Sequence, residues 1–197
     1  MALCCLSMVA VCASAQWTEE MYDQYTTKTY SQYPGFRQHV DEENYDAALL
    51  EAAIFFEINK QRAKNRLPEL KFDAKLSQCA REHSLDMAKH EFFDHVSPTA
   101  GRQELSDRLA LVGYTDCPFA SENIVNVVVR PTYAETARFI VEEKWMGSKI
   151  HREIMLRDGL THIGCGIAIY NESDGGDEDL DHERLYVKAT AVFVTMP

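Results

Sequence analysis

The sequence predicts an α+β domain or an α-β-α sandwich, on three observations. Helical periodicity dominates from residue 41 to residue 111 and returns over residues 132–145. Segments with alternating apolar residues lie from residue 123 onward, and early helices followed by antiparallel strands are typical of these classes. The chain has 197 residues, of which 46% are hydrophobic and 26% charged, so it can form one domain with a sizeable core.

The first fifteen residues are expected to direct secretion. They carry no charged side chain and end in Ala13-Ser14-Ala15, a small-x-small cleavage pattern. A short membrane anchor is the less favoured alternative, because a bilayer-spanning helix needs about 20 apolar residues. We predict a signal peptide over residues 1–15, cleavage before Gln16, and a secreted, extracellular protein.

The charge balance excludes some partners. The chain has 31 acidic and 20 basic residues, a net charge of −11. Because a phosphate backbone requires a basic face, we expect no nucleic-acid partner, and an anionic membrane surface is disfavoured for the same reason. No later stretch is apolar and long enough to span a membrane, so the protein is not expected to be membrane-spanning.

Residues 16–40 are polar and aromatic without a clear period, and we expect a flexible leader that is partly packed at most. The domain proper is expected over residues 41–197. Its first helix is predicted to begin at a cap on Asp41 and to end before Pro68, with an apolar face in steps of four residues: Leu50, Ile54 and Ile58.

Three further helices are predicted. One runs from Asp73 to Glu91, with a buried stripe formed by Leu76, Ala80, His83 and Met87. A short one covers residues 103–111 and ends at Gly113. The last opens at a capping box of Thr132 and Glu135 and reaches about Trp145.

Strands are predicted over residues 123–130, 163–170 and 184–194. The last two flank an acidic stretch, residues 172–183, which we interpret as a solvated hairpin loop. A calcium site is the sharper alternative, although the spacing does not match an EF-hand; its oxygens would come from Asp174, Asp177, Asp179 and Asp181.

Three cysteines remain after the predicted cleavage: Cys79, Cys117 and Cys165. An oxidising compartment would permit one internal bridge, for which Cys79–Cys117 is a guess. Alternatively, Cys79 and Cys165 are small buried hydrophobes. The sequence leaves both alternatives open.

Candidate chemistry lies at the ends of the predicted elements. His95 and His151 each follow a helix, and Glu122 precedes a strand. Side chains at element ends can converge on a cleft, but each of these residues alone is equally typical of an exposed histidine or a solvated carboxylate. His83 and Met87 lie on the apolar stripe and are expected in the core.

An ordered series of motifs connects these residues and covers about 70% of the chain. From Asn59 onward the chain resembles the CAP superfamily of cysteine-rich secretory, antigen-five and pathogenesis-related-one proteins, and most resembles its bacterial-type branch. The matching stretches include Ala80-x-x-His83-Ser84, Phe93-Asp94-His95-x-Ser97-Pro98, Asp107-Arg108-Leu109, Glu122-Asn123-Ile124, Trp145-Met146-x-Ser148-x-x-His151-Arg152 and His162-Ile163-Gly164-x-Gly166.

The resemblance implies an α-β-α sandwich with a central antiparallel sheet and a cleft of two histidines and two acids that can bind a divalent metal. His95, Glu122 and His151 match the first histidine, the first acid and the second histidine. The second acid aligns with Ser148, and Ile150 replaces a usual glycine, so zinc would be held weakly by His95 and His151.

Two functions remain in view. The first is a secreted domain that binds a sterol or fatty acid, a metal or a protein partner without catalysis; the resemblance implies these ligands, and the lipid-binding residues are unknown. The second is a metal-assisted hydrolase or peptidase with Glu122 as base. A Ser148-His151-Glu122 hydrolase is disfavoured because no G-x-S-x-G elbow is present, and Ser148 is expected to cap the turn that carries His151. Phe55 and Phe56 widen the apolar face of the first helix, which suggests either an apolar ligand site or ordinary core.

Overall fold

The structure is a computed structural model that describes residues 16–41, 43–173 and 183–196. The predicted signal peptide lies outside these residues. So do the four aspartates of the calcium alternative, Asp174, Asp177, Asp179 and Asp181.

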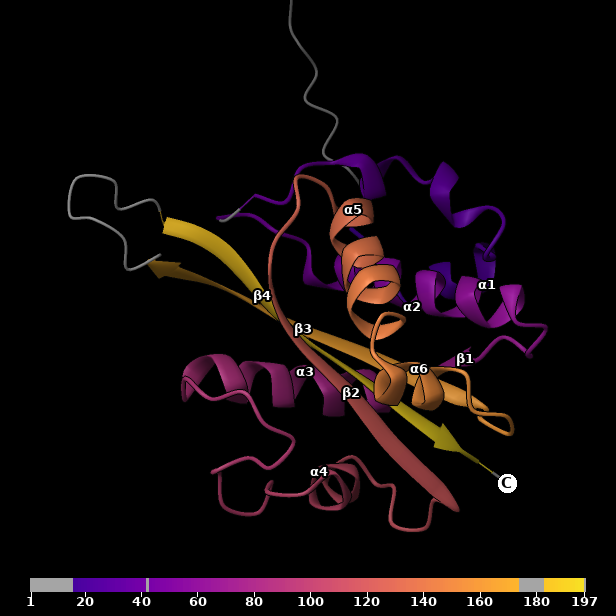
Figure 1. The fold of residues 1–197 in the computed structure, drawn as a ribbon, viewed down its shortest axis with the longest axis vertical. Coiled ribbons are helices and arrows are strands. Elements are labelled where there is room, and N and C mark those ends of the chain that lie inside the picture. Colours follow the sequence, from indigo (N-terminus) through magenta and orange to yellow (C-terminus); the bar gives the residue numbers. More distant parts are fainter. Residues whose placement is uncertain (1–15, 42, 174–182, 197) are drawn as a thin grey trace, which may run out of the picture.

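A four-stranded sheet forms the middle layer of the described chain (Figure 1). Its order is β1-β3-β4-β2. The strands are β1 (Lys71–Phe72), β2 (Phe119–Val128), β3 (His162–Ser173) and β4 (Glu183–Thr195). β2, β4 and β3 pair antiparallel, as expected, and β1 adds a short parallel edge beside β3. β1 was not predicted, because two residues carry no periodicity.

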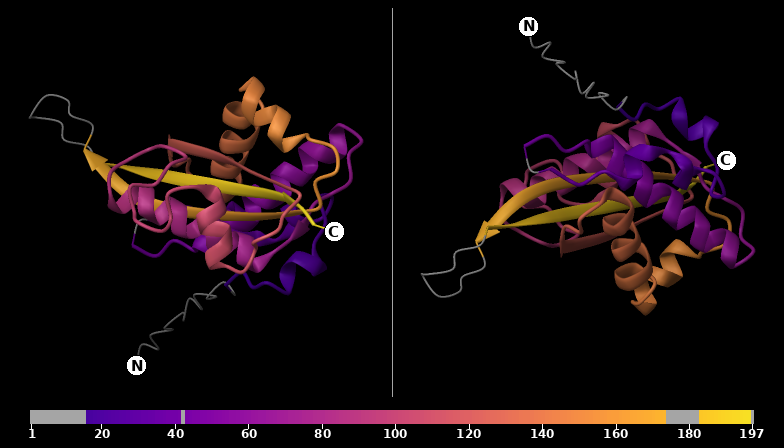
Figure 2. Two further views of the ribbon diagram at one scale, coloured as in Figure 1. Left: turned by 90° about the horizontal axis from the view of Figure 1, so that it is seen from below. Right: turned by 90° about the horizontal axis from the view of Figure 1, so that it is seen from above.

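Helices cover both faces of this sheet and give the expected α-β-α sandwich. α3 (Ala74–Lys89) and α4 (Leu105–Leu111) lie on one face, and α2 (Ala47–Lys64) and α5 (Tyr133–Arg138) on the other (Figure 1). A π-helical stretch, η3 (Phe139–Trp145), continues α5, and α6 (Lys149–Met155) packs beside β2. β3 and β4 run the length of the molecule (Figure 2).

The capping signals were partly right. α3 begins after Asp73, whose carboxylate accepts the Leu76 N–H at 2.8 Å, and the capping box of Thr132 and Glu135 opens α5. The cap predicted at Asp41 is wrong. α2 begins after Asp46, because Asp41 instead accepts backbone N–H groups two and three residues ahead and closes a turn of its own.

Two glycines of β3 bring α3 directly onto the sheet. A methyl group on Gly166 would overlap the backbone of Ala80 and Arg81, and one on Gly164 would overlap the backbone of Leu76 and Ser77. The helix backbone therefore lies against the strand without intervening side chains. This close approach sets the distance between the sheet and the α3 residues that follow, which include His83.

The leader is packed, in contrast to the expectation of a flexible segment. Trp17 is 4% exposed and Phe36 is 1% exposed, and both belong to the main core. Three short helices shape the segment: α1 (Met21–Gln24), η1 (Tyr30–Gln32) and η2 (Pro34–Arg37). Aromatic rings bury a large area without any regular period, which is why the pattern did not reveal this packing.

The cysteines match the second alternative. All three are free thiols, and Cys79 and Cys165 are buried, so the guessed Cys79–Cys117 bridge is wrong. Burial raises the pKa of the Cys79 thiol to about 12, which suits an inert core residue.

Candidate functional site

Glu122 is the centre of the predicted site. It lies on β2 with its side chain 4% exposed. One carboxylate oxygen, Oε1, accepts a hydrogen bond from His95 Nδ1 at 3.0 Å and a second from Arg108 Nη2 at 2.7 Å. The structure therefore brings His95 and Glu122 together, as predicted, and adds a buried guanidinium.

Arg108 is a site residue that the sequence reasoning missed. It projects from α4, is 3% exposed, and also donates to the backbone carbonyls of His95, Arg102 and Gln103. It thereby ties the loop that carries His95 to the carboxylate. The motif Asp107-Arg108-Leu109 was visible in the sequence, but helical spacing cannot reveal that Arg108 reaches a residue 14 positions away.

His83 is buried in the core, as predicted, and it also borders the site. Its Nε2 lies 3.1 Å from the carbonyl oxygen of Asp94 and 3.9 Å from Glu122 Oε1. Three basic side chains, His83, His95 and Arg108, thus surround one carboxylate.

The proton affinities follow from this crowding. Burial alone would raise the pKa of Glu122, but the His95 hydrogen bond and the charges of Arg108 and His83 together lower it. The hydrogen bond to Glu122 raises the pKa of His95, while burial lowers the pKa of His83. The arrangement favours an ionised carboxylate beside a readily protonated His95.

His151 lies on α6. Its backbone carbonyl accepts from Asn123 Nδ2 at 3.0 Å, which joins α6 to the residue after Glu122. Its ring Nδ1 is buried and has no hydrogen-bond partner among the described residues. Burial and then the charge of His95 lower the pKa of His151.

Ser148 occupies the N-cap position of α6, but its side chain makes no capping hydrogen bond, so that part of the expectation is wrong. Its backbone carbonyl accepts the Arg152 N–H at 2.9 Å instead. In the part of the chain that the structure describes, no hydrogen bond joins Ser148 to His151, as a nucleophile–base pair would require.

A metal would find few ligands here. Within residues 16–41, 43–173 and 183–196, no three His, Cys, Asp or Glu side chains are grouped to hold an ion. The residues present do not fit a closed zinc site, which takes four ligands.

A family model for the cysteine-rich secretory protein family, CAP, matches residues 55–187. The chain belongs to the CAP family. Two relatives from Bacillus subtilis (strain 168) are a membrane protein, YlbC, 36% identical over 110 residues, and a protein named YkwD, 35% identical over 108 residues. Each alignment covers 55% of this chain but only 29% and 38% of those proteins.

Solved structures share the fold. An extracellular protein with an SCP domain from Bacillus anthracis str. Ames superposes with a TM-score of 0.57 at 24% identity, over 77% of this chain and 42% of its own. An outer surface protein of Borrelia burgdorferi gives 0.54 at 16% identity, over 82% and 99%. Similarity at these identities establishes the fold alone. No helix in the described residues has the length and apolar character to cross a membrane.

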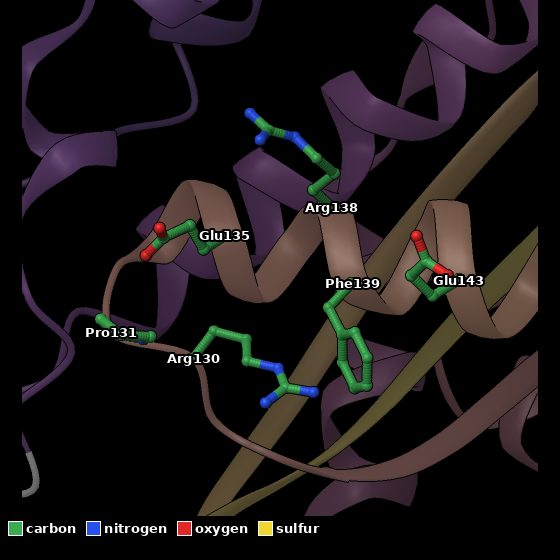
Figure 3. A pocket seen from close by; sticks show the side chains of 6 residues that line it. All are labelled: Arg130, Pro131, Glu135, Arg138, Phe139 and Glu143. Carbon is green, nitrogen blue, oxygen red and sulfur yellow. The ribbon is translucent and has the colours of Figure 1, made fainter.

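Other hollows lie away from Glu122. One, of about 420 Å³, is bordered by Arg130, Pro131, Glu135, Arg138, Phe139 and Glu143 (Figure 3). The Arg130 guanidinium already lies over the Phe139 ring, 3.8 Å from its centre, and Glu143 follows one helical turn after Phe139. This cation is therefore engaged within the protein.

Proposed function

We propose that this chain is a secreted CAP-domain protein that acts by binding a small apolar ligand, and that the histidine cleft is not needed for that binding. The observation that carries the proposal is a cavity of about 430 Å³ between the leader and α2. Its volume lies in the range of small-molecule sites.

Aromatic side chains form much of this cavity. Tyr22 and Tyr25 come from the leader, Phe55 and Phe56 from α2, and Phe72 from β1. Tyr22 stacks on Phe72 with ring centroids 3.7 Å apart, so the leader forms a wall of the cavity rather than a loose cover. Rigid apolar walls of this kind gain roughly 25 cal/mol for each Å² of ligand surface that they bury.

Charged residues line the same cavity as the aromatic side chains. Glu19, Asp23, Glu69 and Lys71 also line it, together with His162. An amphipathic ligand with one polar end, such as a sterol or a fatty acid, matches this combination of an apolar wall and polar groups. Lys71 stands among three carboxylates, so a neutral polar end such as a sterol hydroxyl is favoured over a fatty-acid carboxylate.

The contacts of Glu122 argue against a general-base role. Oε1 is held by a buried arginine and by His95, while Oε2 is buried and has no hydrogen-bond partner in the described residues. The lowered pKa of Glu122 makes the carboxylate a weak base whichever oxygen would act. These contacts support a structural role for the carboxylate, and they weigh against the hydrolase alternative.

The test is a titration with cholesterol and with palmitate, in which binding is measured by the fluorescence of the buried tryptophans Trp17 and Trp145. We expect Tyr25→Ala to weaken binding about tenfold, while Tyr45→Ala, a matched change of another partly buried tyrosine outside the cavity, leaves binding unchanged. The double variant His95→Ala with His151→Ala should bind like the wild type. Binding that disappears only in that double variant would move the ligand to the cleft.

A second candidate is weak zinc binding by His95 and His151. It is favoured by the buried ring nitrogen Nδ1 of His151, which has no partner in the described residues. Since an imidazole must be neutral to bind a metal, and since Glu122 raises the pKa of His95, affinity should fall steeply between pH 7.5 and pH 5.5. Calorimetry at both pH values measures this, and equal affinities would exclude histidine ligation.

A further inference from the structure

A separate hollow of about 610 Å³ lies on the sheet face that α3 covers, near the C-terminal end of that helix. Asn126 of β2 and Lys188 of β4 are register partners in its floor, and Tyr170 of β3 lies beside them. The lining also includes Glu91 and Phe93, which follow α3, and Glu172 of β3.

Lys188 is the unusual member of this lining, because it is a lysine with only 5% of its surface exposed. Its ammonium donates to the carbonyl oxygen of Met87 at 2.9 Å and lies 4.8 Å from the centre of the Tyr170 ring. No described carboxylate lies within 4 Å of it. An ammonium has three donors, so capping the end of α3 leaves donors for the hollow.

The neighbours of Lys188 supply the complementary acceptors. Tyr170 donates its hydroxyl to Asn126 Oδ1 at 2.8 Å, which orients the Asn126 amide, and it lies 3.4 Å from a carboxylate oxygen of Glu172. Burial lowers the pKa of Lys188, while the charges of Glu172 and Glu91 oppose that shift. The hollow is therefore lined by a donor, Lys188, and by acceptors, Glu172 and Glu91.

An aromatic wall stands beside these polar groups. Phe93 is half exposed although it is a large apolar side chain. Phe92, its neighbour, is held edge-on against the His83 ring with centroids 6.0 Å apart. The loop that carries Phe93 is therefore anchored to the core through Phe92, and Phe93 lines the hollow next to it.

We propose that this hollow binds a neutral saccharide. A hydroxyl group both donates and accepts hydrogen bonds, so a sugar ring can satisfy Lys188, Asn126 and Glu172 together. An anion would face Glu91 and Glu172, and an aliphatic chain would leave the ammonium donors that do not bind Met87 unsatisfied. The apolar face of a sugar ring can lie on Phe93.

The proposal goes beyond the apolar-ligand cavity, because the two sites share none of their lining residues. It is tested with three neutral trisaccharides, triacetylchitotriose, maltotriose and cellotriose, each titrated to 10 mM and followed by saturation-transfer NMR. Palmitate and inorganic phosphate are titrated in parallel as the aliphatic and anionic competitors.

We expect at least one trisaccharide to bind and neither competitor to displace it. Phe93→Ala should weaken binding about fivefold or more, while Leu111→Ala, a change of another exposed large apolar residue on α4, should leave it unchanged. Lys188→Met should weaken it about tenfold or more, since a hydrogen bond from a charged donor is lost. Because Lys188→Met also removes a helix cap, Phe93→Ala is the variant whose folding is secure.

Three results would each overturn the proposal. They are no binding of any trisaccharide at 10 mM, unchanged affinity in Phe93→Ala, and displacement of the sugar by palmitate or phosphate.

Discussion

Arg108→Ala should be among the most destabilising single substitutions near the candidate site. The change removes a guanidinium with 3% exposure that donates to Glu122 Oε1 at 2.7 Å and to three backbone carbonyls at 2.9–3.2 Å. Glu122 would then remain buried with His95 as its nearest cation. Breaking a buried ion pair on one side costs about 3–5 kcal/mol, so we expect a loss of that size in the free energy of unfolding.

The loss should depend on pH in a defined direction. In the wild type the pKa of Glu122 is lowered on folding, so its contribution is present above its ordinary pKa and is lost as the pH falls through the folded pKa. Without Arg108, burial is less opposed and the folded pKa rises. The variant carboxyl therefore takes up a proton earlier, and the difference between variant and wild type should shrink from pH 7.5 to pH 5.0.

Urea unfolding followed by tryptophan fluorescence measures both effects, since Trp17 and Trp145 are buried. Arg102→Ala is the matched control: Arg102 also pairs with a glutamate, Glu82, but both side chains are 30% exposed, so the cost should stay below about 1 kcal/mol. In a Glu122→Gln background, removal of Arg108 should cost less than in the wild type. The reasoning is refuted if Arg108→Ala costs no more than Arg102→Ala, or if its cost grows as the pH falls.

Three further predictions test the packing of the core and the signal peptide. Gly166→Ala should destabilise the fold by about 1–3 kcal/mol or more in urea unfolding, because the added methyl overlaps the α3 backbone; a neutral effect would contradict the close approach. Trp17→Ala should cost about 3–5 kcal/mol if the leader is part of the core, whereas a loose leader predicts almost no change. N-terminal sequencing of the exported protein should begin at Gln16, and a product that retains Met1 inside the cell would disprove the signal peptide.

Much of the fold was accessible from the sequence, because periodicity and capping are local. The stripe from Leu76 to Met87 predicted α3, and the Thr132–Glu135 box predicted the start of α5. The leader was misjudged since Trp17 and Phe36 are buried through ring contacts with distant residues such as Phe56, which no local period encodes. Asp41 and Asp46 both resemble caps, and only the backbone course decides between them.

The sequence predicted only part of the candidate site. The resemblance singled out His95, Glu122 and His151. The structure joins His95 to Glu122 at 3.0 Å, and His151 is tied to the next residue, Asn123, through its backbone carbonyl. Neither Arg108 nor the second role of His83 could be inferred, because their reach to Glu122 depends on how α4 and α3 are set on the sheet. The sequence pattern did not indicate that Lys188 is buried. Its burial depends on the position of β4 between β3 and β2, which the sequence of the strand alone does not encode.

Native mass spectrometry tests the central claim, that this CAP domain binds a small apolar ligand away from its histidines, most directly. The exported protein is incubated with an equimolar mixture of cholesterol and palmitate, separated from free lipid, and weighed intact. The account predicts one lipid mass added to the wild type and equally to the double variant His95→Ala with His151→Ala, and a largely unliganded Tyr25→Ala variant. A wild type that carries no lipid, or a double variant that alone has lost it, would contradict the account.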